Sequence, residues 1–208
     1  MHRWFLTLIA GLMLVVPAWG QMGNAGADED EAVAVVERLH ATLIDVMKHA
    51  DELGYDGRFK RLEPVVGEVN DMDAISRSAM GRHWESLTDQ QRTLFKQTFL
   101  KLSVATYAAR FDGFSGEHFE TVETRTLKRG GVLVRTHLVK SDGQPVHLDY
   151  VLHQRDGKWR IVNIIAEGVS DLAIKRSEYD AIMTRDGFDT LIEKIRGKIA
   201  GFEKSSKK

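Results

Sequence analysis

The segments Val146-His147-Leu148-Asp149-Tyr150 and Trp159-Arg160-Ile161-Val162-Asn163-Ile164-Ile165-Ala166-Glu167-Gly168-Val169-Ser170 decide how this chain folds. Their apolar residues alternate in the way that the lining of a β-sheet does. Asp156-Gly157, which lies between them, is typical of a tight hairpin turn, and Ser170 is well placed to cap a following helix. The stretch therefore predicts two antiparallel strands that lead into a helix. It contains few side chains with catalytic chemistry.

Two further strands are predicted before this pair. Gly130-Gly131 and Asp142-Gly143 mark turns, and the apolar residues of 119–127 and 132–139 recur with a period of two. The sheet is therefore predicted to be an antiparallel meander of about four strands.

Helical patterns lie on both sides of the sheet. Apolar residues recur at steps of three and four over 28–53, 58–69 and 73–80. Thr88 and Gln91 form a predicted capping box that opens a helix reaching about Arg110. Two more helices are predicted over 171–184 and 187–200. Helices, then an antiparallel sheet, then helices again indicate an α+β fold with about six helices.

Composition limits the classes of function. The chain has 208 residues, of which 43% are hydrophobic, and these values predict one globular domain. The net charge is −1, so the protein is not expected to attract nucleic acid strongly. The sequence has no cysteine, which excludes disulfides and lipidation at an N-terminal cysteine.

The first residues have the pattern of an export signal. A basic start precedes an apolar run over 4–16, and Pro17 and small residues follow it. We predict a signal peptide over 1–20, a flexible lead-in over 21–29, one domain over 30–202 and a loose polar tail over 203–208. Cleavage near Ala25-Gly26-Ala27 and an uncleaved membrane anchor are the alternatives.

Two-residue hairpins would pair Ser141 with Gln144 and Arg155 with Lys158, and would fix which residues share a face of the sheet. Both faces are then apolar, so each must be covered or must hold a guest molecule. We expect one face to line a cavity, with these apolar residues: Leu133, Val139, Val146, Leu148, Tyr150, Leu152, Trp159, Ile161 and Ile165. Leu102, Tyr107 and Phe111 from the long helix are expected to complete the wall. Packing in the core is the alternative for the two aromatic residues.

Two polar groups on the strands could carry chemistry. Arg135, His137 and Asn163 fall beside Tyr150 on the same predicted face and could receive a polar head group or form a hydrogen-bonded core cluster. His147 and Asp149 share the other face and could serve as an acid and a base, could bind a metal together with a third ligand, or could be a solvated polar edge. No phosphate-binding loop, serine-nucleophile motif or zinc-ligand spacing is present, so no metal or cofactor is predicted.

The chain resembles the MlaC family of periplasmic lipid carriers, which are also called toluene-tolerance auxiliary proteins. The resemblance rests on 146–150, on the run 159–170, on Thr184-Arg185-Asp186-Gly187-Phe188-Asp189-Thr190-Leu191, and on Met80-Gly81-Arg82-His83-Trp84 followed by 87–92 and Phe95. Asp171-Leu172-Ala173 and Ser177-Glu178-Tyr179 look closer to the family's hopanoid-associated HpnM branch.

The resemblance implies an NTF2-like α+β fold that encloses an apolar cavity. It also implies a soluble periplasmic shuttle that carries phospholipid or hopanoid, with two partners: an inner-membrane ABC transporter bearing MCE domains, and an outer-membrane lipoprotein. On this reading the protein is not an enzyme. The alternative is an NTF2-like dehydratase or isomerase that uses His147 and Asp149.

Overall fold

A computed structural model describes residues 25–128 and 130–206. The predicted signal peptide, 1–20, lies outside the described residues. The described part begins with helices: α1 (Ala25–Lys48), α2 (Ala50–Val69), α3 (Met72–Met80), η1 (Gly81–Ser86, a 3₁₀ helix) and α4 (Asp89–Arg110). The strands come next: β1 (His118–Thr126), β2 (Val132–Val139), β3 (Pro145–Arg155), β4 (Lys158–Ala166) and β5 (Val169–Ser170). Helices α5 (Asp171–Arg185) and α6 (Gly187–Ser205) follow. None of the described helices combines the length and the hydrophobicity of a membrane span.

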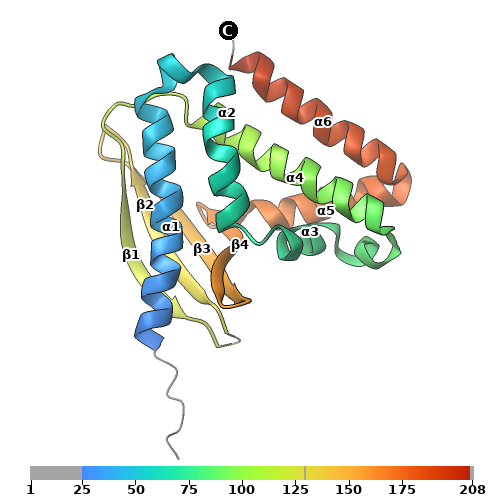
Figure 1. Cartoon of the computed structure of the whole chain (residues 1–208), viewed down its shortest axis with the longest axis horizontal. Coiled ribbons are helices and arrows are strands. Elements are labelled where there is room, and N and C mark those ends of the chain that lie inside the picture. Colours follow the sequence, from blue (N-terminus) through green and yellow to red (C-terminus); the bar gives the residue numbers. More distant parts are fainter. Residues whose placement is uncertain (1–24, 129, 207–208) are drawn as a thin grey trace, which may run out of the picture.

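The α+β prediction is confirmed, with one strand more than expected. The strands pair antiparallel in the order β1-β2-β3-β4-β5 (Figure 1). The additional strand, β5, exists because Glu167 and Gly168 both adopt positive φ angles, of 50° and 76°, which turns the chain straight back onto β4.

The helix boundaries follow local signals. The capping box is present, since the Thr88 side chain accepts from the Gln91 N–H and the Gln91 side chain accepts from the Thr88 N–H. The first helix ends at Lys48, short of residue 53, where its predicted pattern ends, and Gly54 breaks helical geometry inside α2 with a φ of 57°. Helix also covers 25–29 and 203–205, where a lead-in and a tail were expected.

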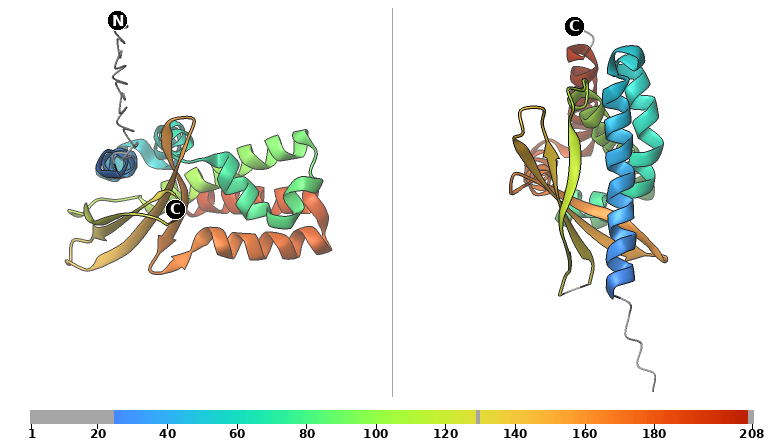
Figure 2. Two further views of the ribbon diagram at one scale, coloured as in Figure 1. Left: turned by 90° about the horizontal axis from the view of Figure 1, so that it is seen from below. Right: turned by 90° about the vertical axis from the view of Figure 1, so that its left-hand side faces the viewer.

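The molecule has two halves. In one half, α1 lies across the sheet with α2 beside it. The other half consists of helices α3, α4, α5 and α6, which lie together next to α2 and beyond the sheet (Figure 2). Helix α4 contacts both α2 and α6, so it joins the halves.

The predicted register between β2 and β3 is wrong by one residue. The backbone of Lys140, not Ser141, donates to the Gln144 carbonyl at 3.1 Å, and Gly143 adopts a φ of 80°. The connection is therefore a three-residue loop, and Val134 pairs with Tyr150. Because side chains alternate along a strand, this shift moves every β2 residue to the opposite face.

Four predicted cavity or head-group residues change face as a result. Leu133, Arg135, His137 and Val139 share a face with His147 and Asp149, opposite Tyr150. We call this the outer face of the sheet, and the face with Tyr150, which α1 covers, the inner face.

The predicted pairing of Arg155 with Lys158 is confirmed, but a β-bulge follows it. Leu152 pairs with Ile161 and Val151 pairs with Asn163, so one residue of β4 is left over between them. Beyond the bulge, Ile164 and Ala166 pair with Tyr150 and Leu148 on the inner face, whereas Ile165 pairs with Asp149 on the outer face.

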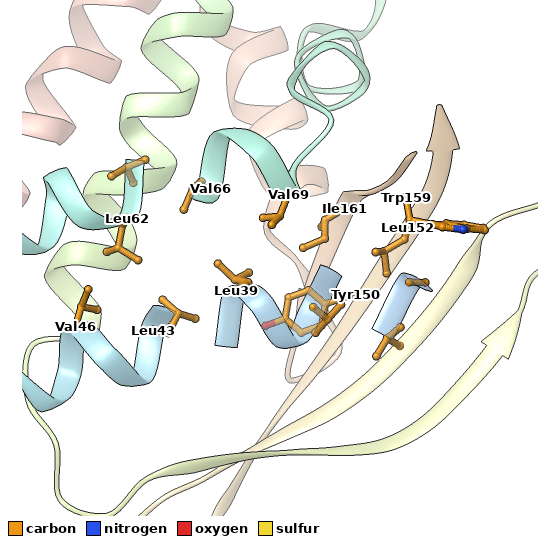
Figure 3. Close-up of a cluster of buried hydrophobic side chains, with 14 of the residues drawn as sticks. Leu39, Leu43, Val46, Leu62, Val66, Val69, Tyr150, Leu152, Trp159 and Ile161 are labelled. Carbon is orange, nitrogen blue, oxygen red and sulfur yellow. The ribbon is translucent and has the colours of Figure 1, made fainter. Parts of the chain in front are cut away.

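Two clusters of buried apolar side chains form the core. The first lies between α1, α2 and the inner face of the sheet, and its labelled members in Figure 3 are Leu39, Leu43, Val46, Leu62, Val66, Val69, Tyr150, Leu152, Trp159 and Ile161. The second gathers residues of α3, η1, α4, α5 and α6 around Phe95, Tyr179 and Leu191. Leu152 and Trp159, which were predicted to line a cavity, instead belong to the solid core beneath α1 and α2.

Candidate functional site: an apolar cavity between α4 and the sheet

A cavity of about 630 Å³ lies between α4, α1 and the inner face of the sheet. This volume is within the range of natural small-molecule sites. Its floor is built by buried residues: Leu43, Met47, Asn70, Phe99, Tyr150 and Ile161. Its mouth is built by exposed residues: Arg110, Asp112, Gly113, Ser115, Lys140 and Asp171. The cavity is therefore apolar at its closed end and charged where it opens.

Three polar side chains of the wall, those of Asn70, Ser103 and Thr106, bond to the protein itself. The Asn70 amide donates to the Val66 carbonyl at 2.8 Å, and the Ser103 hydroxyl donates to the Phe99 carbonyl at 3.1 Å. The Thr106 hydroxyl donates to the Leu102 carbonyl at 2.8 Å. Burying a polar group costs free energy mainly when the group has no hydrogen-bond partner. Hydrocarbon can therefore cover these three side chains without leaving a polar group unbonded.

Behind the wall, Tyr150 is held by His40 of α1. Tyr150 Oη and His40 Nε2 are 3.0 Å apart, and the His40 ring stacks on Phe119 with ring centroids 3.7 Å apart. Burial lowers the pKa of His40 to about 3 and raises the pKa of Tyr150 well above its usual value. Both side chains are therefore uncharged at neutral pH.

The mouth carries charges of both signs. The Lys175 ammonium lies 2.5 Å from the Asp171 carboxylate, and Glu117 accepts from the Ser115 backbone N–H at 2.6 Å. Among the described residues, no carboxylate pairs with Arg110 or Lys140. These two cations are available to an anionic group at the opening.

Sequence reasoning did not single out Arg110, Lys140 or Lys175. Each resembles a solvated surface cation in the sequence, because each lies at the end or on the polar side of an element. They meet only because α4 ends over the sheet, near the end of β2 and the start of α5.

Seven of the predicted site residues line this cavity: Tyr107, Phe111, Val146, Leu148, Tyr150, Ile161 and Asn163. Asn163 lies beside the bulge, and its Oδ1 accepts from the Ser170 hydroxyl at 3.0 Å. Leu102 does not reach the cavity but lines a neighbouring groove.

The other predicted site residues lie elsewhere. Leu133, Val139 and Ile165 are on the outer face, and Leu152 and Trp159 are in the core. Arg135 is also on the outer face, where it donates to Asp149 at 3.0 Å and to Glu123 at 2.5 Å. His137 packs against His147, with ring centroids 4.4 Å apart. The corrected register accounts for the four β2 residues, and the bulge accounts for Ile165.

The pair His147 and Asp149 does not face the cavity. Both residues lie on the outer face, His147 is exposed, and Asp149 is bonded to Arg135. Within the part of the chain that the structure describes, no cluster of three or more histidine and carboxylate side chains could hold a metal ion. The hypothesis of an acid–base pair inside a cupped sheet therefore loses its geometric basis.

Comparison with known proteins places the chain in a family. The family described as MlaC protein matches residues 37–197. The chain is 21% identical over 203 residues to the intermembrane phospholipid transport system binding protein MlaC of Haemophilus influenzae, covering 94% of this chain and 92% of that protein. It is 21% identical over 145 residues to the toluene tolerance protein ttg2D of Pseudomonas putida, covering 68% and 67%.

The fold has a counterpart among solved structures. A phospholipid-binding protein from Ralstonia solanacearum, solved in complex with a phospholipid, superposes with a TM-score of 0.72 at 20% identity, covering 84% of this chain and 98% of that one. Since the family match spans most of the sequence, and the fold is shared with this structure, the chain belongs to the MlaC family.

Proposed function

We propose that this protein is a periplasmic lipid-binding protein that carries phospholipid or hopanoid between the outer and inner membranes. The observation that carries the proposal is the cavity, with its apolar floor, its charged mouth, and the Asn70, Ser103 and Thr106 side chains of its wall, which bond within the protein. The names of two relatives, an intermembrane phospholipid transport binding protein and a toluene tolerance protein, support it.

The energetics of hydrocarbon burial fit a reversible carrier. Hiding about thirty methylenes from water stabilises a complex by on the order of 20 kcal/mol, whereas one head-group hydrogen bond contributes about 1 kcal/mol. Tail burial therefore dominates the affinity. Transfer from a membrane exchanges one apolar surrounding for another, so the net change is small in either direction.

In this arrangement the head group lies at the mouth. Arg110 and Lys140 have no carboxylate partner among the described residues and lie at the open end of the cavity. A phosphate there would stay in contact with water while gaining charge-assisted hydrogen bonds. Arg135 and His137, on the outer face, have no part in this proposed site, whereas Asn163 remains at the cavity wall.

The proposal extends to partners and location. We infer that the chain is exported after removal of 1–20 and serves as the soluble component of an ABC transport system with MCE domains, exchanging lipid also with an outer-membrane lipoprotein. The family membership supports this wider assignment.

Native mass spectrometry of the full chain, purified from the periplasm, tests the proposal. We expect the protein to retain a co-purified lipid, and extraction followed by mass analysis will distinguish phospholipid from hopanoid. A protein that carries no lipid, and takes none from vesicles of mixed phospholipids and hopanoids, would refute the carrier function.

A further inference from the structure

A second, half-open groove of about 500 Å³ lies between α4, α5 and α6. Leu102 and Phe202 supply its apolar surface, and Gly201 leaves space beside them. The hydroxyls of Thr106 and Ser205 also line it, but each donates to a carbonyl of its own helix, at 2.8 and 3.0 Å. Lys198 also lines the groove, and its ammonium is paired with Glu178 at 2.6 Å. Hydrocarbon that covers Leu102, Phe202 and the two hydroxyls would therefore leave no uncharged polar group without a partner.

The groove and the cavity meet at four residues that line both: Thr106 and Arg110 of α4, and Asp171 and Lys175 of α5. Lys175 is already paired with Asp171. Arg110 is exposed and has no carboxylate partner among the described residues. An unpaired guanidinium thus lies where two apolar spaces join.

Phe202 marks how close the groove comes to the interior. This half-buried side chain packs against both buried clusters, the one beneath α1 and α2 and the one among α3 to α6. A chain lying on Phe202 would continue the packing of the two clusters toward the surface of α6.

We propose that the groove is a second site for a hydrocarbon chain, continuous with the cavity. The ligand is a lipid whose anionic group, a phosphate or a carboxylate, is bound by Arg110, with one chain in the cavity and another in the groove. The site rests on the proposed carrier function, and it assigns a role to Leu102, which lies outside the cavity.

A bulky residue at Gly201 tests the site. A Cβ at this position would meet no atom within 4 Å, and the backbone has no positive φ, so Gly201→Trp introduces a bulky side chain at the groove without backbone strain in α6. The matched control is Ala200→Trp, because Ala200 is exposed, does not line the groove, and points about 100° away from Gly201 around the helix.

Binding of two probes is measured for the full chain: a diacyl phosphatidylglycerol and palmitate, which has one chain. For Gly201→Trp we expect the Kd of the diacyl lipid to rise at least about tenfold, while the Kd of palmitate stays within about twofold of the wild-type value. For Ala200→Trp we expect the Kd values of both probes to be unchanged. If Gly201→Trp bound the diacyl lipid as tightly as the wild-type protein does, the proposal of a second site would be wrong. If the wild-type protein binds neither probe, the carrier function itself fails, and the site with it.

A second measurement uses only the wild-type protein. Phosphatidylglycerol with a photoreactive diazirine in one chain should label peptides of α6 that contain Phe202 as well as peptides of the cavity wall, such as β3. Labelling confined to the cavity wall would overturn the proposal, even if the Gly201→Trp variant did not fold.

Discussion

Single side chains decide whether the cavity accepts hydrocarbon. Leu148 lies on the inner face and lines the cavity, whereas its neighbour His147 is exposed on the outer face. Their contrast comes only from the alternation of side chains along β3. Adjacent positions on this strand therefore provide a direct comparison of the two faces.

Leu148→Arg should remove lipid binding while His147→Arg leaves it intact. A cation in the apolar cavity would have to be desolvated by any hydrocarbon that entered, which opposes binding strongly. We expect co-purified lipid, quantified by mass spectrometry, to fall at least about tenfold in Leu148→Arg. Both variants should give the circular dichroism spectrum of the wild type. Normal lipid content in Leu148→Arg would show that the cargo does not use this cavity.

The buried His40 makes stability depend on pH. Its pKa is about 3 in the folded protein and about 6.5 in the unfolded chain. As the pH falls, the unfolded chain therefore binds a proton at His40 before the folded protein does. The contribution of neutral His40 to the free energy of unfolding is complete above about pH 6.5 and is lost as the pH falls from there toward 3.

Between pH 7 and pH 5 the free energy of unfolding should drop by about 2 kcal/mol through His40 alone. Urea denaturation at the two pH values measures the change, and His40→Gln should reduce it by the same amount. A pH dependence that is identical in the variant would rule out His40 as its source.

At the scale of elements, turn geometry sets the face that each strand presents. The loop between β2 and β3 holds three residues because Gly143 can adopt a φ of 80°. That single extra residue turns Arg135 and His137 away from the cavity. The loop is thus the local feature on which the composition of the site depends.

Gly143→Ala should destabilise the protein by about 1 kcal/mol, because a side chain disfavours a left-handed backbone. The comparison variant is Gly197→Ala in α6, where a Cβ also meets open space but the backbone is helical. It should stabilise by about 0.5–1 kcal/mol. Free energies of unfolding in urea with the same sign for both variants would contradict this account of the loop.

At the scale of the whole molecule, the interior is two clusters joined by α4, with the cavity beside the junction. Hydrocarbon in the cavity would contact side chains of α1, α4 and the sheet at once. A bound lipid should therefore stabilise the native fold as a whole and not one element of it.

Removing the lipid should lower the melting temperature, and adding it back should restore it. A ligand at one hundred times its Kd contributes about 2.7 kcal/mol to the free energy of unfolding. Calorimetry of delipidated protein, with and without added phosphatidylglycerol, measures this change. A melting temperature that does not respond to any lipid would count against a lipid cargo.

The sequence by itself determined the elements and the class of fold. The capping box at Thr88, the N-cap at Ser170, which accepts from the Ala173 N–H, and the hairpin at Asp156-Gly157 are local signals, and each is confirmed. Local signals suffice there because the interacting groups are only a few residues apart. The apolar pattern of β3 also predicted the cavity residues Val146, Leu148 and Tyr150.

Only the tertiary structure decided which face of β2 meets the cavity, where its mouth lies, and what holds Tyr150. The period of a strand is two, so one loop residue and one bulge reversed the faces of Arg135 and Ile165 although the strands themselves were predicted. His40 and Tyr150 are 110 residues apart, and Arg110 meets Lys140 and Lys175 only after α4 packs over the sheet. No local pattern encodes such contacts, because they depend on how all the elements pack together.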